Sequence, residues 1–88
     1  MQIAVYTIYD QKSGVYNKPF YLVNDAVAKR SAVTLLRDET TEIARHPEDF
    51  TLMKLGYFED TNAKFELLEV PEVLCKFIEL QSLIENGA

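Results

Sequence analysis

Residue types that build catalytic, metal and disulfide sites are scarce in this 88-residue chain. One cysteine, Cys75, excludes an internal disulfide framework and a zinc site made of clustered cysteines. There is one histidine, His46, and no tryptophan. Three glycines leave no glycine-rich loop of the kind that holds nucleotide phosphates. A non-enzymatic protein with no cofactor and no metal is therefore expected.

Long apolar runs are lacking too. No stretch approaches the ~20 apolar residues that span a bilayer, and the N-terminus lacks the basic leader followed by an apolar stretch that marks a secretory signal. We therefore expect a cytoplasmic protein that does not contact membranes. The 48% hydrophobic content suits a folded core, so residues 1–88 are expected to form a single domain. A chain this short buries only roughly 60% of its unfolded surface, so a subunit contact would stabilise it.

Charge is divided unevenly along the chain. The formal net charge is −5. Residues 1–37 hold five Lys and Arg against two Asp, a net +3, whereas residues 38–88 hold four against twelve Asp and Glu, a net −8. An acidic protein is a poor candidate for coating nucleic acid in general, but its basic first part is still suited to bind phosphate or the acidic part of a second copy.

The pattern of apolar residues predicts strands at residues 1–9, 20–23, 50–58 and 64–70. Both faces of the first strand are largely apolar, which predicts a central strand covered on both sides. The last two strands are close enough to form a hairpin around the polar residues 60–63.

Capping and breaking residues predict the helices. Asn24 is a good N-cap for a helix over residues 25–38, and Pro47 ends a short helical turn over 42–46. Pro71 suits the first position of a second main helix, which Asn86-Gly87 ends. One face of that helix would carry Val73, Phe77, Leu80 and Ile84. The fold class is therefore α+β, a small antiparallel sheet of about three to four strands packed by two main helices, in the order β–(short β)–α–β–β–α.

The densest polar cluster is His46-Pro47-Glu48-Asp49. One interpretation makes His46 an acid or base beside a carboxylate, and another makes it a metal ligand with Glu48 or Asp49. A polar turn in which Pro47 fixes the entry to the next strand explains the cluster without further partners and is favoured. Cys75 is interpreted in the same way, as a small buried apolar residue instead of a nucleophile.

Aromatic residues gather near the start of the chain. Five of the ten lie within the first 21 residues: Tyr6, Tyr9, Tyr16, Phe20 and Tyr21. Lysines are interleaved with them, and single-stranded nucleic-acid sites combine stacking aromatics with cations that follow the backbone. The competing interpretation, favoured on the residue pattern alone, is that Tyr6 and Phe20 belong to the core and the lysines form an ordinary surface.

Four segments resemble a known family: Tyr6-Thr7-Ile8-Tyr9-Asp10, Pro19-Phe20, the run from His46 to Leu52, and the run from Leu55 to Asp60. Together they are similar to the small nonstructural protein of gokushovirus-type microviruses, phages with circular single-stranded DNA. The resemblance covers roughly residues 3–71, and its most specific part is HPED-aromatic-T-L followed by LGYFED. Asn62-Ala63 stands where the family more often has a glycine. The resemblance implies a nonstructural, DNA-associated role in the host cytoplasm and supplies no catalytic residues.

The leading hypothesis is a non-enzymatic accessory protein of single-stranded DNA genome synthesis or packaging. Phosphates would meet Lys12, Lys18, Lys29, Arg30 and Arg37, while Tyr16 and Tyr21 would stack on bases. The alternative is a homodimeric interaction module that modulates the replication initiator or procapsid without touching DNA. Its contact would use three apolar residues assigned to the C-terminal helix: Leu74, Ile78 and Leu83.

Overall fold

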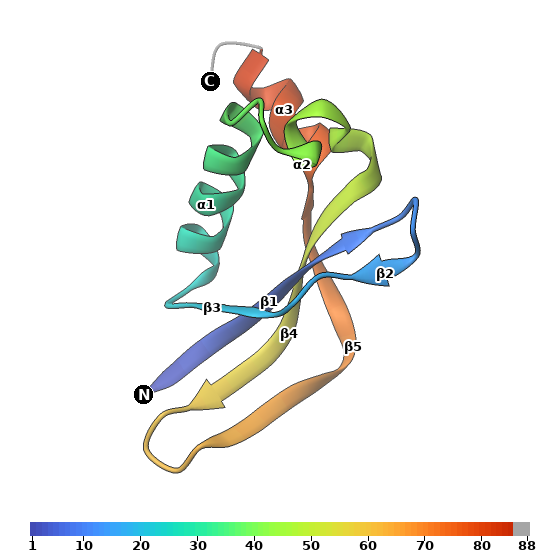
Figure 1. The fold of residues 1–88 in the computed structure, drawn as a ribbon. Helices are drawn as coiled ribbons and strands as arrows, with labels where there is room; N and C mark the ends of the chain where they lie inside the picture. The colour runs from blue at the N-terminus through green and yellow to red at the C-terminus, as the bar shows by residue number, and fades with distance from the viewer. Residues whose placement is uncertain (86–88) are drawn as a thin grey trace.

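The computed structural model describes residues 1–85 of the chain (Figure 1), so the predicted helix stop at Asn86-Gly87 lies outside the described residues. The elements in chain order are β1 (Gln2–Asp10), β2 (Val15–Tyr16), β3 (Phe20–Leu22), α1 (Asp25–Arg37), α2 (Glu42–Arg45), the 3-10 turn η1 (Pro47–Asp49), β4 (Phe50–Glu59), β5 (Lys64–Lys76) and α3 (Phe77–Glu85). The predicted α+β fold class and element order are confirmed, with β2 as an additional short strand.

The sheet is antiparallel and has β1 near its centre. Its order is β2-β1-β4-β5, and β3 pairs with the same edge of β1 as β2 does. The pairs Val5–Tyr21 and Tyr9–Tyr16 show that β3 lies beside the first half of β1 and β2 beside the second half. The two edges of the sheet are therefore the interrupted pair β2 and β3 on one side and the long strand β5 on the other.

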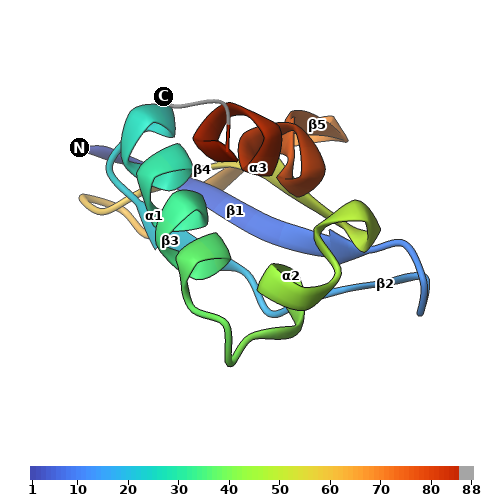
Figure 2. The same cartoon turned by 90° about the horizontal axis from the view of Figure 1, so that it is seen from above.

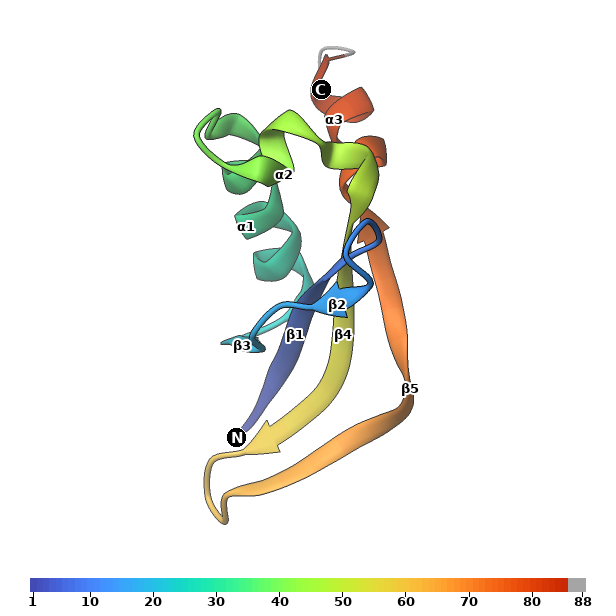
Figure 3. The same ribbon diagram turned by 45° about the vertical axis from the view of Figure 1, so that its right-hand side comes forward.

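All three helices pack on one face of the sheet, which we call the helix face (Figures 2 and 3). Its core joins Tyr6 and Leu52 of the strands to Ala32 of α1, Ile43 of α2 and Phe77 of α3. Side chains alternate along a strand, so residues such as Val5 and Thr7 point to the opposite, helix-free face. The prediction that β1 is central is confirmed, but helices cover it on one side only.

The first helix is fixed to the sheet through its N-terminus. The Asn24 side chain accepts a hydrogen bond from the Val27 N–H at 2.9 Å, as the N-cap prediction requires. In the first turn, the Asp25 carboxylate accepts a 2.6 Å hydrogen bond from the Tyr6 hydroxyl and lies 3.2 Å from the Lys54 ammonium. The hydrogen bond from Tyr6 is the main cause that lowers the pKa of Asp25, and Lys54 lowers it further. The Asp25 carboxylate is therefore charged and neutralises the buried Lys54.

The hairpin of β4 and β5 contains two backbone positions with positive φ. Gly56 in β4 has φ +150°, and a Cβ built there would lie 2.3 Å from the Glu66 carbonyl oxygen of β5. Ala63 in the turn has φ 60° and belongs to the Asn62-Ala63 pair, which stands where the resembled family more often has a glycine. The glycine of the LGYF segment is therefore required by the structure, since only glycine allows the two strands to approach so closely.

The second main helix begins six residues later than predicted. Strand β5 continues through Pro71 to Lys76, and α3 starts at Phe77. The register with β4 passes from Leu67 directly to Glu72, so Pro71 lies in a segment without a β4 partner, where a missing N–H breaks no pairing with β4. Phe77, Leu80 and Ile84 do face the core, but Val73 lies on the strand and is 54% exposed.

The long hairpin makes the molecule elongated. Its radius of gyration is 13.5 Å and its principal extents are 42 × 28 × 21 Å, against about 12 Å expected for a compact domain of this length. The turn between β4 and β5 extends well beyond the helices (Figure 1), and β5 bends partway along its length (Figure 3). Much of β5 is therefore exposed.

Candidate nucleic-acid interface

Five aromatic residues gather on the helix-free face, and we call them the aromatic strip: Tyr9, Tyr16, Tyr21, Phe58 and Phe65. The rings of Tyr9 and Tyr16 lie 4.7 Å apart between centroids. Tyr21, Phe58 and Phe65 form a second group, in which the two phenylalanine rings are 4.9 Å apart and Tyr21 lies 6.1 Å from Phe58. Each group offers rings on a face that no helix of the described residues covers.

Strand pairing places the two groups on one face. Tyr16 is opposite Tyr9, and Tyr21 is opposite Val5. Tyr9 and Val5 both belong to β1 and, an even number of residues apart, point to the same face. Tyr9 lies four residue steps after Val5 along β1, which corresponds to about 13 Å at ~3.3 Å per residue. Tyr16 and Tyr21 are 51% and 47% exposed, so each presents about half of its surface to solvent.

The segment between β2 and β3 is held against β1. The Asn17 N–H donates to the Ile8 carbonyl oxygen at 2.9 Å, and the Thr7 hydroxyl donates to the Asn17 carbonyl oxygen at 2.7 Å. Lys18 and Pro19 follow directly, before the chain returns to β1 as β3. Lys18 is exposed and lies between the two tyrosines in sequence, which makes it the predicted cation best placed beside the strip.

The five predicted cations do not share one surface. Lys12 lies in the turn between β1 and β2, where it also borders a small pocket beside His46. Lys29, Arg30 and Arg37 belong to α1, which packs on the helix face. Of the seven residues predicted to touch DNA, the structure brings together Tyr16, Tyr21 and Lys18, with Lys12 at the adjoining turn, and it places the three α1 cations on the opposite layer.

Sequence reasoning missed several members of this face. Phe58 and Phe65 are paired across β4 and β5, and the alternation of the two predicted strands around their turn already contained that signal. Lys76 is exposed and opposite Thr51, which is itself opposite Tyr9. Directly opposite residues share a face, so Lys76 is a cation of the helix-free face that was hidden by its assignment to a helix.

Tyr6 and Phe20 belong to the core, as the competing interpretation predicted for these two. Tyr6 is fully buried, and its ring lies 5.9 Å from that of Phe20. Burial, followed by the hydrogen bond to Asp25, raises the pKa of the Tyr6 hydroxyl. The tyrosine-rich start of the chain thus divides between the two faces, with Tyr6 inside and Tyr9, Tyr16 and Tyr21 outside.

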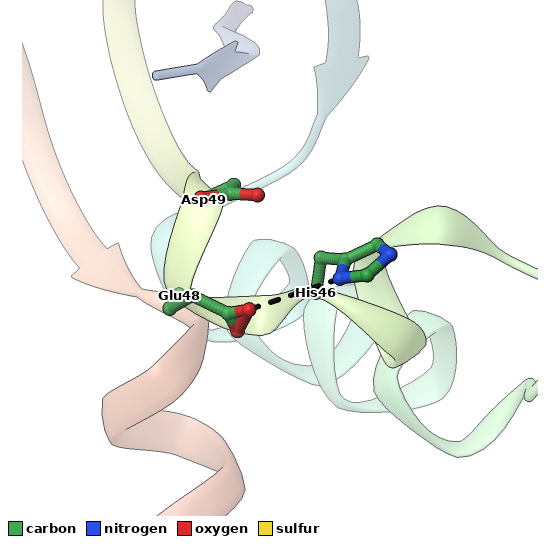
Figure 4. A group of neighbouring side chains, drawn as sticks. All are labelled: His46, Glu48 and Asp49. Carbon is green, nitrogen blue, oxygen red and sulfur yellow. Dashed lines mark ion pairs between the residues drawn. The ribbon is translucent and has the colours of Figure 1, made fainter. Parts of the chain in front are cut away.

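The His46-Pro47-Glu48-Asp49 segment forms the polar turn that its sequence predicts (Figure 4). The Asp49 carbonyl oxygen accepts the Gln11 N–H at 2.8 Å, which ties this turn to the one between β1 and β2. His46 Nδ1 lies 3.8 Å from a Glu48 carboxylate oxygen, and both side chains are more than half exposed. One potential ligand atom from each of His46, Glu48 and Asp49 lies within 4.8 Å of the others. The contact that joins the two turns is made by the Asp49 backbone and not by these side chains.

Cys75 and the predicted partner-contact residues also have defined places. Cys75 is half-buried at the end of β5, and burial raises the pKa of its thiol, which lowers the thiolate fraction at neutral pH. Leu74 is on β5 and packs against the core, so its assignment to an exposed helix surface was wrong. Ile78 and Leu83 are on α3 and are 38% and 59% exposed.

Within residues 1–85 no helix combines the length and apolar content that crossing a membrane requires. A protein-family model described as "Phage ORF5 protein" matches residues 3–80. Neither the curated proteins nor the solved structures contain a match to the chain.

Proposed function

The chain belongs to the Phage ORF5 protein family, and from this premise we propose that it is a non-enzymatic accessory protein for synthesis or packaging of a phage genome. The resemblance to small nonstructural proteins of gokushovirus-type microviruses directs the proposal to a phage with single-stranded DNA, acting in the host cytoplasm. The proposed activity is binding of single-stranded DNA on the helix-free face.

The observation that carries the proposal is the aromatic strip itself. Base stacking on aromatic side chains is worth about 1–3 kcal/mol per base and tolerates any sequence. Tyr16, Tyr21 and Phe65 are each about half exposed, and they lie on a face free of helices. Two separate ring groups about 13 Å apart provide two stacking positions along one strand of DNA.

Cations around the strip would contact the phosphates. Lys18 lies between β2 and β3, Lys76 lies across the sheet from Tyr9, and Lys12 lies in the nearby turn. With only a few such contacts and a net charge of −5, the affinity should be modest and should fall as salt rises. The acidic remainder of the molecule then limits indiscriminate coating of DNA.

Two matched triple variants test which cations bind DNA. One carries Lys12→Gln, Lys18→Gln and Lys76→Gln, and the other carries Lys29→Gln, Arg30→Gln and Arg37→Gln, so both change the net charge by the same amount. We expect the first to lose at least about tenfold in affinity for a labelled oligo-dT in fluorescence anisotropy at low salt, and the second to lose much less. Equal losses would contradict the assignment to the helix-free face.

Stacking is tested separately from charge. Tyr16→Ala and Tyr21→Ala should each weaken oligo-dT binding by about tenfold, because each removes one stacking ring. The matched Tyr16→Phe and Tyr21→Phe variants keep a ring and should bind nearly as well as the wild type. If the alanine and phenylalanine variants bind alike, the rings do not stack on bases.

A second candidate function is the homodimeric interaction module that modulates the replication initiator or procapsid. The negative net charge supports it, because it opposes approach to DNA, and the exposed Ile78 and Leu83 of α3 offer a contact. Under this alternative, Ile78→Asp and Leu83→Asp would impair phage propagation while oligo-dT binding by the wild type would be absent. Oligo-dT binding that depends on the aromatic strip would exclude it as the sole function.

A further inference from the structure

The outer edge of β5 is an unpaired strand edge with exposed apolar side chains. The strand is 13 residues long, and within residues 1–85 it pairs with β4 alone. Its large apolar residues range from 39% to 72% exposed: Phe65, Leu67, Leu68, Val70 and Val73. A long apolar edge strand offers a row of free N–H and C=O groups to another strand, so this edge is suited to bind a strand in extended conformation.

The exposed apolar area of β5 is a large part of what association of two chains requires. At roughly 100 Å² each, about half the surface of a large side chain, the five residues expose on the order of 500 Å² before the strand backbone is counted. A standard interface takes about 800 Å² from each partner. The exposed part of β5 therefore supplies a large share of one side of a protein–protein contact.

The charges along β5 are complementary to those of a second β5. Lys64 and Glu72 both belong to the row of side chains on the helix face, because they are opposite Glu59 and Lys54 of β4. An antiparallel pairing of two β5 strands about a two-fold axis at Leu68, with the irregular segment between Leu67 and Glu72 drawn out into regular strand, places Lys64 of each copy opposite Glu72 of the other. The combined row then reads Glu59, Lys64, Glu72 and Lys54 across four strands, with signs that alternate.

Neighbouring registers lack this complementarity. A two-fold axis at Glu69 would oppose Glu66 with Glu72, two acids, and an axis at Val70 would oppose Lys64 with Lys76, which lie on different faces of the sheet. Like charges directly opposite one another destabilise a sheet. A shift by one residue would set residues of opposite faces against each other. Charge and face together therefore select the register about Leu68.

We propose that two copies of this chain associate edge to edge through β5, antiparallel about Leu68, with Lys64 of each copy facing Glu72 of the other. Pro71 has no N–H, so one ladder hydrogen bond per copy is missing at its position. Leu68 meets its own counterpart at the axis, and Phe65 meets Pro71. Because a two-fold axis through a shared sheet is perpendicular to it, both helix-free faces point to the same side of the dimer.

Charge reversal in the full-length chain tests the contact, with the mass measured by sedimentation from low micromolar to several hundred micromolar protein. The wild type should dimerise reversibly. Lys64→Glu and Glu72→Lys each replace two attractive pairs with two repulsive ones, and each should weaken dimerisation at least about tenfold. Mixing the two variants restores both pairs, so the mixture should form a heterodimer about as strong as the wild type.

Three control variants separate this contact from others. Lys12→Glu and Glu39→Lys make the same charge changes away from β5 and should leave the dimer intact. Leu83→Asp on α3 should leave it intact as well. A wild type that stays monomeric throughout, single reversals that match their controls, or a mixture as weak as its components would each overturn the proposal. No DNA is present in this test, so its outcome is independent of the proposed DNA binding.

Discussion

At the scale of single residues, Gly56 sets how closely β4 and β5 approach. Its φ of +150° and the 2.3 Å separation between a built Cβ and the Glu66 carbonyl oxygen exclude any side chain without movement of backbone. We expect Gly56→Ala to lower the free energy of unfolding by about 3 kcal/mol, through strain and overpacking. Urea denaturation measures this value.

Gly14 provides the matched control, because its φ of +75° is also positive but nothing lies within 4 Å of a built Cβ. Gly14→Ala should lower stability by only about 1 kcal/mol. If both variants lose the same amount, the close approach of β5 at Gly56 has no energetic consequence.

Ala63 belongs to the Asn62-Ala63 pair at which the chain departs from the resembled family, and its backbone is strained. Its φ is 60°, which is unfavourable for a residue with a Cβ by about 1–2 kcal/mol. Ala63→Gly removes that strain but gives the unfolded chain more freedom, so a net gain of about 0.5–1 kcal/mol is expected in thermal or urea unfolding.

Asn62→Gly is the control for Ala63→Gly. The Asn62 side chain accepts the Lys64 N–H at 3.0 Å, so glycine at position 62 should destabilise the turn. A loss of stability in Ala63→Gly, or a gain in Asn62→Gly, would contradict the assignment of strain to position 63.

Asp25 links the stability of α1 to pH. The Tyr6 hydroxyl and Lys54 lower the pKa of Asp25 in the folded protein. The ionised carboxylate therefore adds to the free energy of unfolding above the ordinary carboxyl pKa, and this stabilisation is lost as pH falls through the lowered pKa. We expect the free energy of unfolding of Asp25→Asn to change less with pH than that of the wild type between about pH 2 and 5. An acid dependence equal to that of the wild type would show that this carboxylate is not involved.

At the scale of elements, most of the fold follows from the sequence because local signals and packing agree. Asn24 caps α1 as expected, and Pro47 leads into β4. The boundary between β5 and α3 could not be predicted, because Pro71 is equally compatible with a helix start and an edge strand. Pro71 is accommodated in the strand because the stretch between Leu67 and Glu72 has no partner in β4. That stretch is defined only by the pairing of β5 with β4.

The exposed edge of β5 predicts a concentration-dependent exchange of backbone amides. In the paired state, outward-facing N–H groups of residues 65–70 gain partners and should exchange more slowly. We expect their exchange to slow as protein concentration rises, while the amides of β3 at the other edge keep their rates. Equal rates for β5 at all concentrations would contradict pairing through this strand.

At the scale of the whole molecule, the candidate interface was only partly predictable. The alternation of side chains along β1 predicts that Tyr9 and Tyr6 point to opposite faces of the sheet. Tyr16 and Lys18 were grouped because they are close in sequence. The separation of Lys29, Arg30 and Arg37 from the tyrosines could not be foreseen, because it depends on which face of the sheet receives α1. Lys76 was missed because its face is defined only by the pairing with Thr51.

The absence of tryptophan makes tyrosine emission a direct probe of the central claim that the aromatic strip stacks on single-stranded DNA. Three of the five tyrosines belong to the strip. On titration with oligo-dT at low salt, tyrosine fluorescence should be quenched to saturation, and added salt should restore it. Emission that stays unchanged at low salt, while the protein remains folded, would contradict the account.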